Sequence, residues 1–102
     1  MAVTQLCKDN FDEVVSGSER SVLIAFYADW CGPCHMLAPV IDEIAAERGD
    51  VHVCRVNVDE ENELAARFGV SAIPMLVVMR GGKPDKTAVG YMPKEQVLEL
   101  LD

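Results

Sequence analysis

Two cysteines stand close together in the stretch DWCGPCHM, where only Gly32 and Pro33 separate Cys31 from Cys34. A pair at this spacing suits three kinds of chemistry: half of a zinc site, a structural disulfide, or a redox centre that alternates between dithiol and disulfide. Each possibility requires something different from the rest of the chain. A zinc site needs further ligands, whereas a redox pair needs one cysteine that ionises readily.

The further ligands that a zinc site would need are sparse. The remaining candidates are all single residues, with no second close pair among them: Cys7, His35, His52 and Cys54. We expect Cys7 and Cys54 to be small buried hydrophobic residues and His52 to be an ordinary strand residue. No metal site is therefore expected. Since a hydrophobic content of 50% can build a core without disulfide staples, a catalytic pair is favoured over a structural bridge.

The segments around the pair predict where its sulfur atoms lie. The run SVLIAFYADW, residues 21–30, is apolar and rich in β-branched and aromatic residues, which is typical of a central strand buried on both faces. After the pair, apolar residues recur at helical spacing: Leu37, Val40, Ile41, Ile44 and Ala45. Cys31 therefore falls where a buried strand ends and a helix begins, at the edge where active sites collect in such sheets.

This position favours Cys31 as the nucleophile. Backbone N–H groups at a helix start stabilise negative charge and so favour a thiolate, which is the form that attacks a disulfide. Cys34 comes one turn later, near enough to resolve a mixed disulfide on Cys31 in an intramolecular step. Pro33 stiffens the intervening turn, and Gly32 removes side-chain bulk from the surface that a substrate must touch.

The other strands and helices alternate along the chain. Three further strands are predicted at residues 51–58, 75–80 and 86–91. Besides the helix that follows Cys34, helices are predicted at residues 8–15, 60–68 and 93–102. The predicted order is strand, helix, strand, helix, strand, helix, strand, strand, helix, so one strand precedes the helix at 8–15. This alternation predicts parallel pairing among the first three strands, and the loop GGKPD predicts an antiparallel hairpin between the last two. The expected fold is α/β: a single domain, residues 1–102, with a central mixed sheet of about five strands flanked by about four helices.

Several residues predict where these helices begin, bend and end. Asp59 is the predicted N-cap of the helix at 60–68, and Pro93 should lie in the first turn of the last helix. Gly49 is predicted to end its helix in the left-handed conformation, and Gly69 is predicted to terminate the helix at 60–68. Pro39 removes a backbone donor inside the helix after the cysteines and should kink it.

The chain of 102 residues is acidic overall. Lys and Arg number 9, and Asp and Glu number 17, which gives a net charge of −8. Phosphate backbones and anionic lipids would repel such a protein, so nucleic acid and membranes are not expected partners. The longest apolar runs, VLIAFYA and IPMLVVM, are too short to cross a bilayer, and the start MAVTQLCKDN has no signal-peptide pattern. We therefore expect a cytoplasmic location.

Longer motifs around the cysteine pair resemble a known family. The stretch FYADWCGPCHMLAPV, which includes Trp30 and Pro39, and the stretch VSAIPML are similar to the active-site segments of thioredoxins. The stretch VNVDEENELAARFGV and the VGY around Gly90 fall at the spacings of the same family. The resemblance to the thioredoxin family covers nearly the whole chain, and it implies that the Ile73–Pro74 bond is cis and faces the cysteines.

The resemblance implies a thiol–disulfide oxidoreductase that reduces protein disulfides by reversible oxidation of Cys31 and Cys34 through a mixed disulfide. It implies no cofactor besides this redox-active disulfide, and recharging by a flavin-dependent thioredoxin reductase. The implied role is cell redox homeostasis and electron donation to reductive enzymes, performed by a monomer. The implied substrate groove is apolar and is formed by Trp30, Gly32, Pro33, Ile73, Pro74 and Gly90.

Two positions depart from the family's pattern in ways that bear on the chemistry. Relatives usually carry a buried Asp six residues before the first cysteine, where this chain has Ala25, and a lysine where this chain has Arg55. Without the carboxylate, Arg55 should favour the thiolate and thereby stabilise the reduced form, which makes the protein less reducing. Protonated His35 would add to this effect. The alternatives are that His35 is an exposed helix residue without a role and that Arg55 is an ordinary charged residue at a strand edge. Tyr27 and Met75 are smaller departures.

The missing carboxylate should also slow the release step unless water or another side chain accepts the proton of Cys34. Three alternative functions remain open: an oxidant or isomerase with the same fold, a non-enzymatic subunit that binds a partner through the groove, and a zinc site. Export and a more polar dipeptide between the cysteines would favour the first alternative. The presence of both Cys31 and Cys34 argues against the second, because docking alone requires neither thiol.

Overall fold

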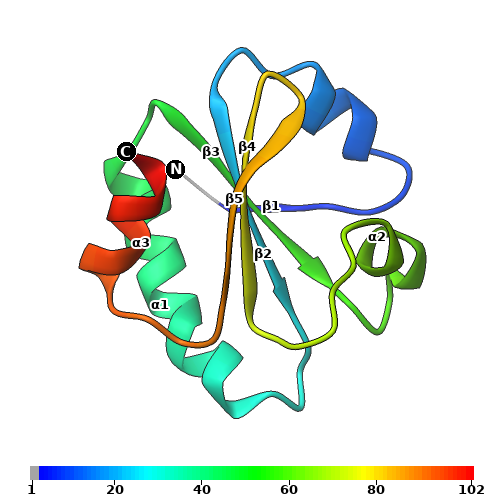
Figure 1. Cartoon of the computed structure of the whole chain (residues 1–102), viewed down its shortest axis with the longest axis vertical. Coiled ribbons are helices and arrows are strands. Elements are labelled where there is room, and N and C mark those ends of the chain that lie inside the picture. The colour runs from blue at the N-terminus through cyan, green and yellow to red at the C-terminus, as the bar shows by residue number, and fades with distance from the viewer. Residues whose placement is uncertain (1–2) are drawn as a thin grey trace.

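The computed structural model describes residues 3–102; Met1 and Ala2, the start of the predicted domain 1–102, lie outside the described residues. A five-stranded mixed sheet carries helices on both faces (Figure 1). The elements in chain order are β1 (Thr4–Gln5), η1 (Asp12–Ser16), β2 (Ser21–Tyr27), α1 (Gly32–Glu47), β3 (Val51–Asn57), α2 (Asn62–Arg67), β4 (Met75–Arg80), β5 (Lys83–Val89) and α3 (Lys94–Leu101). The expected α/β class, with a mixed sheet flanked by helices, is confirmed.

The strands lie in the order β1-β3-β2-β4-β5, which puts β2 at the centre of the sheet. β3 pairs in parallel with both β1 and β2, whereas β4 pairs antiparallel with β2 and β5. The predicted parallel and antiparallel portions are therefore both confirmed. Because β2 has neighbours on both edges and helices over both faces, its residues from Val22 to Phe26 are at most 7% exposed.

Alternation along β2 sends side chains into two separate cores. Leu23 and Ala25 belong to the core under α1 and α3, whereas Val22, Ile24 and Phe26 belong to the core on the face that carries η1 and α2. Successive residues of a strand point to opposite faces, so this uniformly apolar run serves both layers at once. Figure 1 shows the same division, with α1 and α3 on one side of the sheet and α2 on the other.

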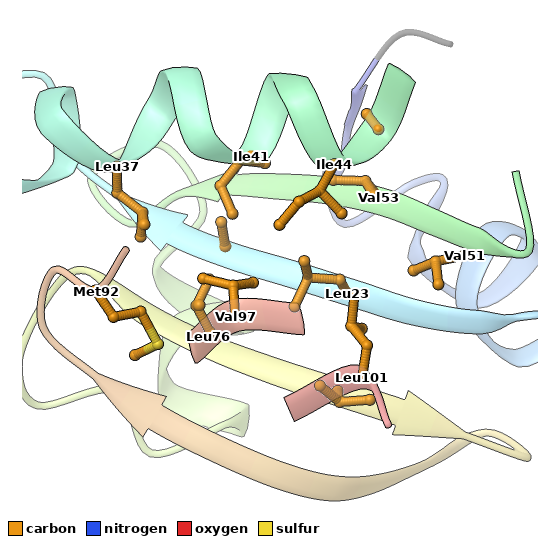
Figure 2. Packing of buried hydrophobic residues seen from close by; sticks show 13 residues of the cluster. Leu23, Leu37, Ile41, Ile44, Val51, Val53, Leu76, Met92, Val97 and Leu101 are labelled. Atoms are coloured by element: carbon orange, nitrogen blue, oxygen red, sulfur yellow. The ribbon is translucent and has the colours of Figure 1, made fainter. Parts of the chain in front are cut away.

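The core under α1 anchors the helix that begins at the cysteines. Leu37, Ile41 and Ile44 point from α1 toward the strands, and Val97 and Leu101 of α3 close the same layer (Figure 2). Each of these side chains is at most 6% exposed. Burying one aliphatic side chain of this size contributes about 1.5–3 kcal/mol, so the start of α1 is held firmly against the sheet. Pro39 lies inside this helix.

The first helix differs from the prediction of residues 8–15. Only a five-residue helix of π type forms, Asp12–Ser16. The preceding residues make a turn instead, because the Asn10 side chain accepts a hydrogen bond from the Cys7 backbone N–H at 2.8 Å. Asn commonly closes such turns through its side-chain oxygen, and this local bond competes with a regular helix.

The prediction of Asp59 as an N-cap is wrong. α2 begins at Asn62 with Glu61 as its N-cap, and no side chain caps it. Asp59 lies in a turn in which its backbone N–H donates to the Asn57 side chain at 2.9 Å. Its carboxylate is used elsewhere, as the acceptor for the Trp30 indole.

Two further boundaries differ from the predictions. Gly49 does not end α1 in the left-handed conformation, since α1 is followed by Arg48 at φ −111° and Gly49 has no positive φ. Gly69 follows the end of α2, as predicted, and has φ +64°. Pro93 is the N-cap of α3 rather than a residue of its first turn.

The hairpin between β4 and β5 is tighter than predicted. Gly81 and Gly82 both have positive φ, 61° and 77°, which suits a two-residue hairpin turn. β5 therefore begins at Lys83 and includes Pro84. Proline is tolerated there because β5 is an edge strand and the register shifts between Val78 and Met79 opposite it. No helix within residues 3–102 is long and apolar enough to cross a membrane.

Candidate active site

The cysteine pair lies where β2 gives way to α1, as the sequence predicts. Cys31 is the N-cap of α1, and its Sγ accepts a hydrogen bond from the Cys34 backbone N–H at 3.2 Å. The two cysteines are joined by a disulfide, with Cα atoms 5.2 Å apart. The first turn contains Gly32 and Pro33, both exposed. Donors at a helix N-terminus face the Cys31 sulfur, so they stabilise negative charge on it when the disulfide is opened.

The pair is shielded from water on most sides. Cys31 is 4% exposed and Cys34 is 5% exposed. Together with Ala28 they form a small apolar cluster against which Tyr27 and Ile73 pack. Gly32 and Pro33, which separate the two cysteines, are by contrast exposed.

The loop before β4 faces the cysteines from across the site. The Ile73–Pro74 peptide bond is cis, and the Ile73 carbonyl oxygen lies 3.9 Å from the Cys31 Sγ. The Pro74 carbonyl accepts a hydrogen bond from the Gly90 backbone N–H at 2.7 Å. Gly90 has φ +98°, a conformation that glycine adopts without strain. Ile73, far from Cys31 in sequence, is thereby brought beside it, and Gly90 is bonded to the next residue of this loop.

Exposed apolar side chains are concentrated in segments around the pair. Trp30 is 72% exposed, and its indole N–H donates to the Asp59 carboxylate at 2.8 Å. The other large exposed hydrophobic residues of the described chain are Met36, Val89 and Tyr91. The sequence analysis did not single out these three residues. The only feature that could have pointed to them is that each lies close in sequence to Cys34 or Gly90.

A pocket of about 220 Å³ lies behind Cys34, between α1 and the sheet. Ala25 and Arg55, which are paired neighbours on β2 and β3, both line it. Cys34, His35 and Pro74 also contribute to its walls. The small side chain of Ala25 leaves this space open, so the buried Cys34 is next to a hollow rather than to packed core.

Arg55 and His35, the predicted tuning residues, are both at this pocket but are each held by another group. The Arg55 Nε donates to the Gln5 side chain at 2.6 Å, and its guanidinium carbon lies 5.6 Å from the centre of the Tyr27 ring. The His35 Nε2 lies 2.6 Å from the Asp29 carbonyl oxygen. Within residues 3–102 no hydrogen bond joins either side chain to a cysteine sulfur.

The remaining cysteines lie away from this site. Cys54 is fully buried, as predicted, and burial raises the pKa of its thiol to about 12. Cys7 is only half-buried, contrary to the prediction, because it lies in the turn after β1 rather than in a strand. His52 is a residue of β3, as predicted, and shares a hydrogen bond with the Thr4 hydroxyl at 2.9 Å. Within the described chain no three His, Cys, Asp or Glu residues cluster as metal ligands.

Comparison with known protein families supports the same interpretation of this site. The family model described as Thioredoxin matches residues 2–102. The chain belongs to the thioredoxin family. Like other members of the thioredoxin family, it is a thiol–disulfide oxidoreductase, and its CxxC disulfide, Cys31–Cys34, lies where that chemistry requires it.

Individual thioredoxins are similar over almost their full length. A thioredoxin of Alicyclobacillus acidocaldarius is 44% identical over 97 residues, covering 94% of this chain and 91% of the relative. A thioredoxin of Staphylococcus haemolyticus is 41% identical over 103 residues, covering 100% and 97%. Thioredoxin 1 of a Nostoc species is 39% identical over 102 residues, covering 99% and 95%. The expected family, fold and reaction type are therefore confirmed.

Proposed function

We propose that this thioredoxin-family chain acts as a single domain that reduces disulfides of other proteins, with Cys31 as nucleophile and Cys34 as resolving thiol. The observation that carries the proposal is the position of the Cys31 Sγ. It caps α1, receives the Cys34 N–H at 3.2 Å, and lies 3.9 Å from the carbonyl oxygen of Ile73. Cys34 is buried on α1, and its sulfur is bonded to that of Cys31.

The reaction follows from these two positions. The Cys31 thiolate attacks one sulfur of the substrate disulfide, and the other substrate sulfur leaves as a thiolate. The Cys34 thiolate then attacks the Cys31 Sγ, which forms the Cys31–Cys34 disulfide and releases the second substrate sulfur. Two electrons pass from the dithiol to the substrate. Because the second attack is intramolecular, it benefits from a high effective concentration.

The substrate groove that we propose is the apolar surface beside Cys31, formed by Trp30, Gly32, Pro33, Ile73, Pro74 and Gly90. Its support is that Ile73 lies beside the Cys31 sulfur and that Gly90 is bonded to Pro74 in the same loop. An extended substrate segment would lie along the backbone at Ile73 like a short added strand. The exposed Trp30 supplies a flat apolar contact whose orientation is set by Asp59.

Arg55 and His35 are the proposed tuning residues. Both line the pocket that Cys34 borders, and a positive charge there favours the thiolate over the thiol. The absence of a carboxylate at Ala25 acts in the same direction. We further propose that the protein works as a monomer in the cytoplasm, that a flavin-dependent thioredoxin reductase recharges it, and that it serves redox homeostasis and reductive enzymes.

The reduction potential of the Cys31–Cys34 pair tests this function directly. The protein would be equilibrated in graded thiol–disulfide buffers at pH 7, and free thiols counted by alkylation and mass. A potential well below the cytosolic glutathione poise, about −220 to −260 mV by extraction, is expected of a reductant. A potential at or above that poise would instead assign the chain to oxidant or isomerase duty.

A Cys31→Ser variant separates catalysis from docking. It should lose all reduction of a protein disulfide while it retains binding to the same protein, because the groove is unchanged. Cys7→Ser is the matched control, since Cys7 lies in the turn after β1, away from the pair. Retained turnover in Cys31→Ser would contradict the assignment of the nucleophile.

A further inference from the structure

We propose that His35 is the proton acceptor for Cys34, acting through water held in the pocket that the two residues share. The inference rests on the proposed function, because it concerns the second step of that reaction. Cys34 must lose its proton before its sulfur can attack the Cys31 Sγ. Cys34 is only 5% exposed, so bulk solvent does not reach its thiol freely. The proton needs a local route.

The pocket provides the route. Cys34 and His35 both line it, and its volume of about 220 Å³ is enough for several water molecules. Polar side chains around the walls give such waters the partners they need to be held. His35 is exposed on α1, so its ring connects the pocket with the solvent outside. A proton that reaches His35 can therefore leave the site.

The contact with Asp29 decides which nitrogen of His35 can accept the proton. The His35 Nε2 lies 2.6 Å from the Asp29 backbone carbonyl oxygen. A carbonyl oxygen only accepts hydrogen bonds, so Nε2 carries a hydrogen in this contact. In the neutral ring the other nitrogen, Nδ1, then has a free lone pair. The contact with the backbone therefore makes Nδ1 the nitrogen of the neutral ring that can accept a proton.

The other charged or titratable groups at the pocket suit the role less well. They come from β2, the loop after it, α1 and β3: Tyr27, Asp29, Asp42 and Arg55. Arg55 stays protonated in proteins and cannot accept a proton. The Tyr27 hydroxyl hydrogen-bonds to the Gln5 side chain. Asp42 follows Cys34 by eight residues on α1, which is about 12 Å along the helix axis. Asp29 is exposed, and it is its backbone carbonyl that contacts His35.

The step balances as follows. In the mixed disulfide, the Cys34 thiol gives its proton to a pocket water while that water gives a proton to the His35 Nδ1. The Cys34 thiolate forms the bond to the Cys31 Sγ, and the bond between Cys31 and the substrate sulfur breaks. The departing substrate thiolate takes a proton from solvent, and His35 returns its proton to solvent. No oxidant or reductant is needed beyond the dithiol and the substrate disulfide.

Stopped-flow reaction with 5,5′-dithiobis(2-nitrobenzoate) tests the step in isolation. The prereduced protein should release two thionitrobenzoate ions: one in a concentration-dependent phase when Cys31 attacks, and one in a concentration-independent phase when Cys34 resolves the mixed disulfide. All proteins would carry Cys7→Ser, because the half-buried Cys7 would also react. The resolving phase would be recorded between pH 5 and pH 8, the range in which histidine side chains change charge.

We expect the resolving rate of the parent to rise with pH across this range. His35→Gln, which keeps an N–H for the Asp29 carbonyl, should lose that rise and slow the resolving phase at least about tenfold at pH 7.5. His52→Gln is the matched control, because the only other histidine lies on β3 with Thr4 as its partner. The His52→Gln variant should show the same pH dependence of the resolving rate as the parent. Ala25→Val, which narrows the pocket while leaving His35 intact, should slow the resolving phase in the same way.

The outcomes separate this inference from the proposed function. Two phases with the same pH profile in the parent and in His35→Gln would overturn the role of His35 while leaving the dithiol mechanism in place. An unchanged resolving rate in Ala25→Val would overturn the role of pocket water. A parent that releases a single thionitrobenzoate would contradict the proposed function itself.

Discussion

Ala25 and Arg55 face each other across the two central parallel strands, β2 and β3, and both line the pocket behind Cys34. Ala25 is 7% exposed, whereas Arg55 is exposed and held by Gln5. A small apolar residue and a cation thus line the same pocket. This arrangement makes position 25 the most informative place at which to change the charge near the cysteines.

Ala25→Asp should lower the free energy of unfolding by about 1–3 kcal/mol at pH 7, because a carboxylate would be buried with few partners. Burial disfavours the charged form, so the pKa of the new carboxyl in the folded state should lie above its unfolded value of about 3.9. The destabilisation therefore develops as the pH rises above the unfolded pKa of about 3.9, and it disappears as the pH falls below that pKa.

Urea denaturation of Ala25→Asp and of its neutral control, Ala25→Asn, would measure this effect. The difference in the free energy of unfolding between the two variants should be largest at pH 7 and should vanish below about pH 4. An Asp variant as stable as the parent at neutral pH would show that Arg55 and pocket water fully solvate the charge.

Asp59→Ala should loosen Trp30, because the indole N–H loses its acceptor. A hydrogen bond to a charged group at an exposed site contributes about 1 kcal/mol, so the KM for a protein disulfide should rise up to about fivefold. The value of kcat and the reduction potential should stay unchanged, since Asp59 is not at the sulfur atoms. Steady-state kinetics would measure this, with Glu60→Ala as the neighbouring control. A fall in kcat at constant KM would contradict the proposed positioning role.

Cys54 should be chemically inert in the folded protein. Burial raises the pKa of its thiol to about 12, and the thiolate is the reactive form. With the Cys31–Cys34 disulfide intact, iodoacetamide at pH 8 should therefore alkylate the half-buried Cys7 but not Cys54. In denaturant, both cysteines should be alkylated. Peptide mass mapping would read out each site. Labelling of native Cys54 at a rate similar to Cys7 would show that this part of the sheet opens readily.

His52 should make stability depend on pH below neutrality. Burial, and to a smaller extent the charge of Arg20, lowers the pKa of its imidazole from the ordinary value of 6.5. As the pH falls below 6.5, the unfolded chain takes up the proton first. The stability that His52 contributes is therefore present above 6.5 and is lost as the pH falls through the folded pKa.

Thermal unfolding at pH 7.5 and pH 5.5 would test this in the parent and in His52→Gln, since Gln can retain a hydrogen bond to Thr4. The midpoint of the parent should fall more between the two pH values than that of the variant. Equal falls in the two proteins would assign the pH dependence to other groups.

Local patterns in the sequence were enough to predict most of the elements and the position of Cys31. The apolar run of β2 and the helical spacing after it place Cys31 at the N-cap of α1, as the structure confirms. Gly69 ends α2 and two glycines make the hairpin turn, because a positive φ restricts the choice of residue at those positions. These features depend on neighbours a few residues away, so sequence reasoning can reach them.

Contacts between distant segments escaped the same reasoning. Asp59 was expected to cap a helix, yet its carboxylate accepts from Trp30, 29 residues away. The hollow beside Cys34 could not be foreseen from Ala25 alone, because its walls come from β2, α1 and β3 together. The Ile73 carbonyl oxygen likewise lies beside the Cys31 Sγ although the two residues are 42 positions apart. Side-chain partners and cavities depend on how packed layers meet, and no local residue pattern encodes that meeting.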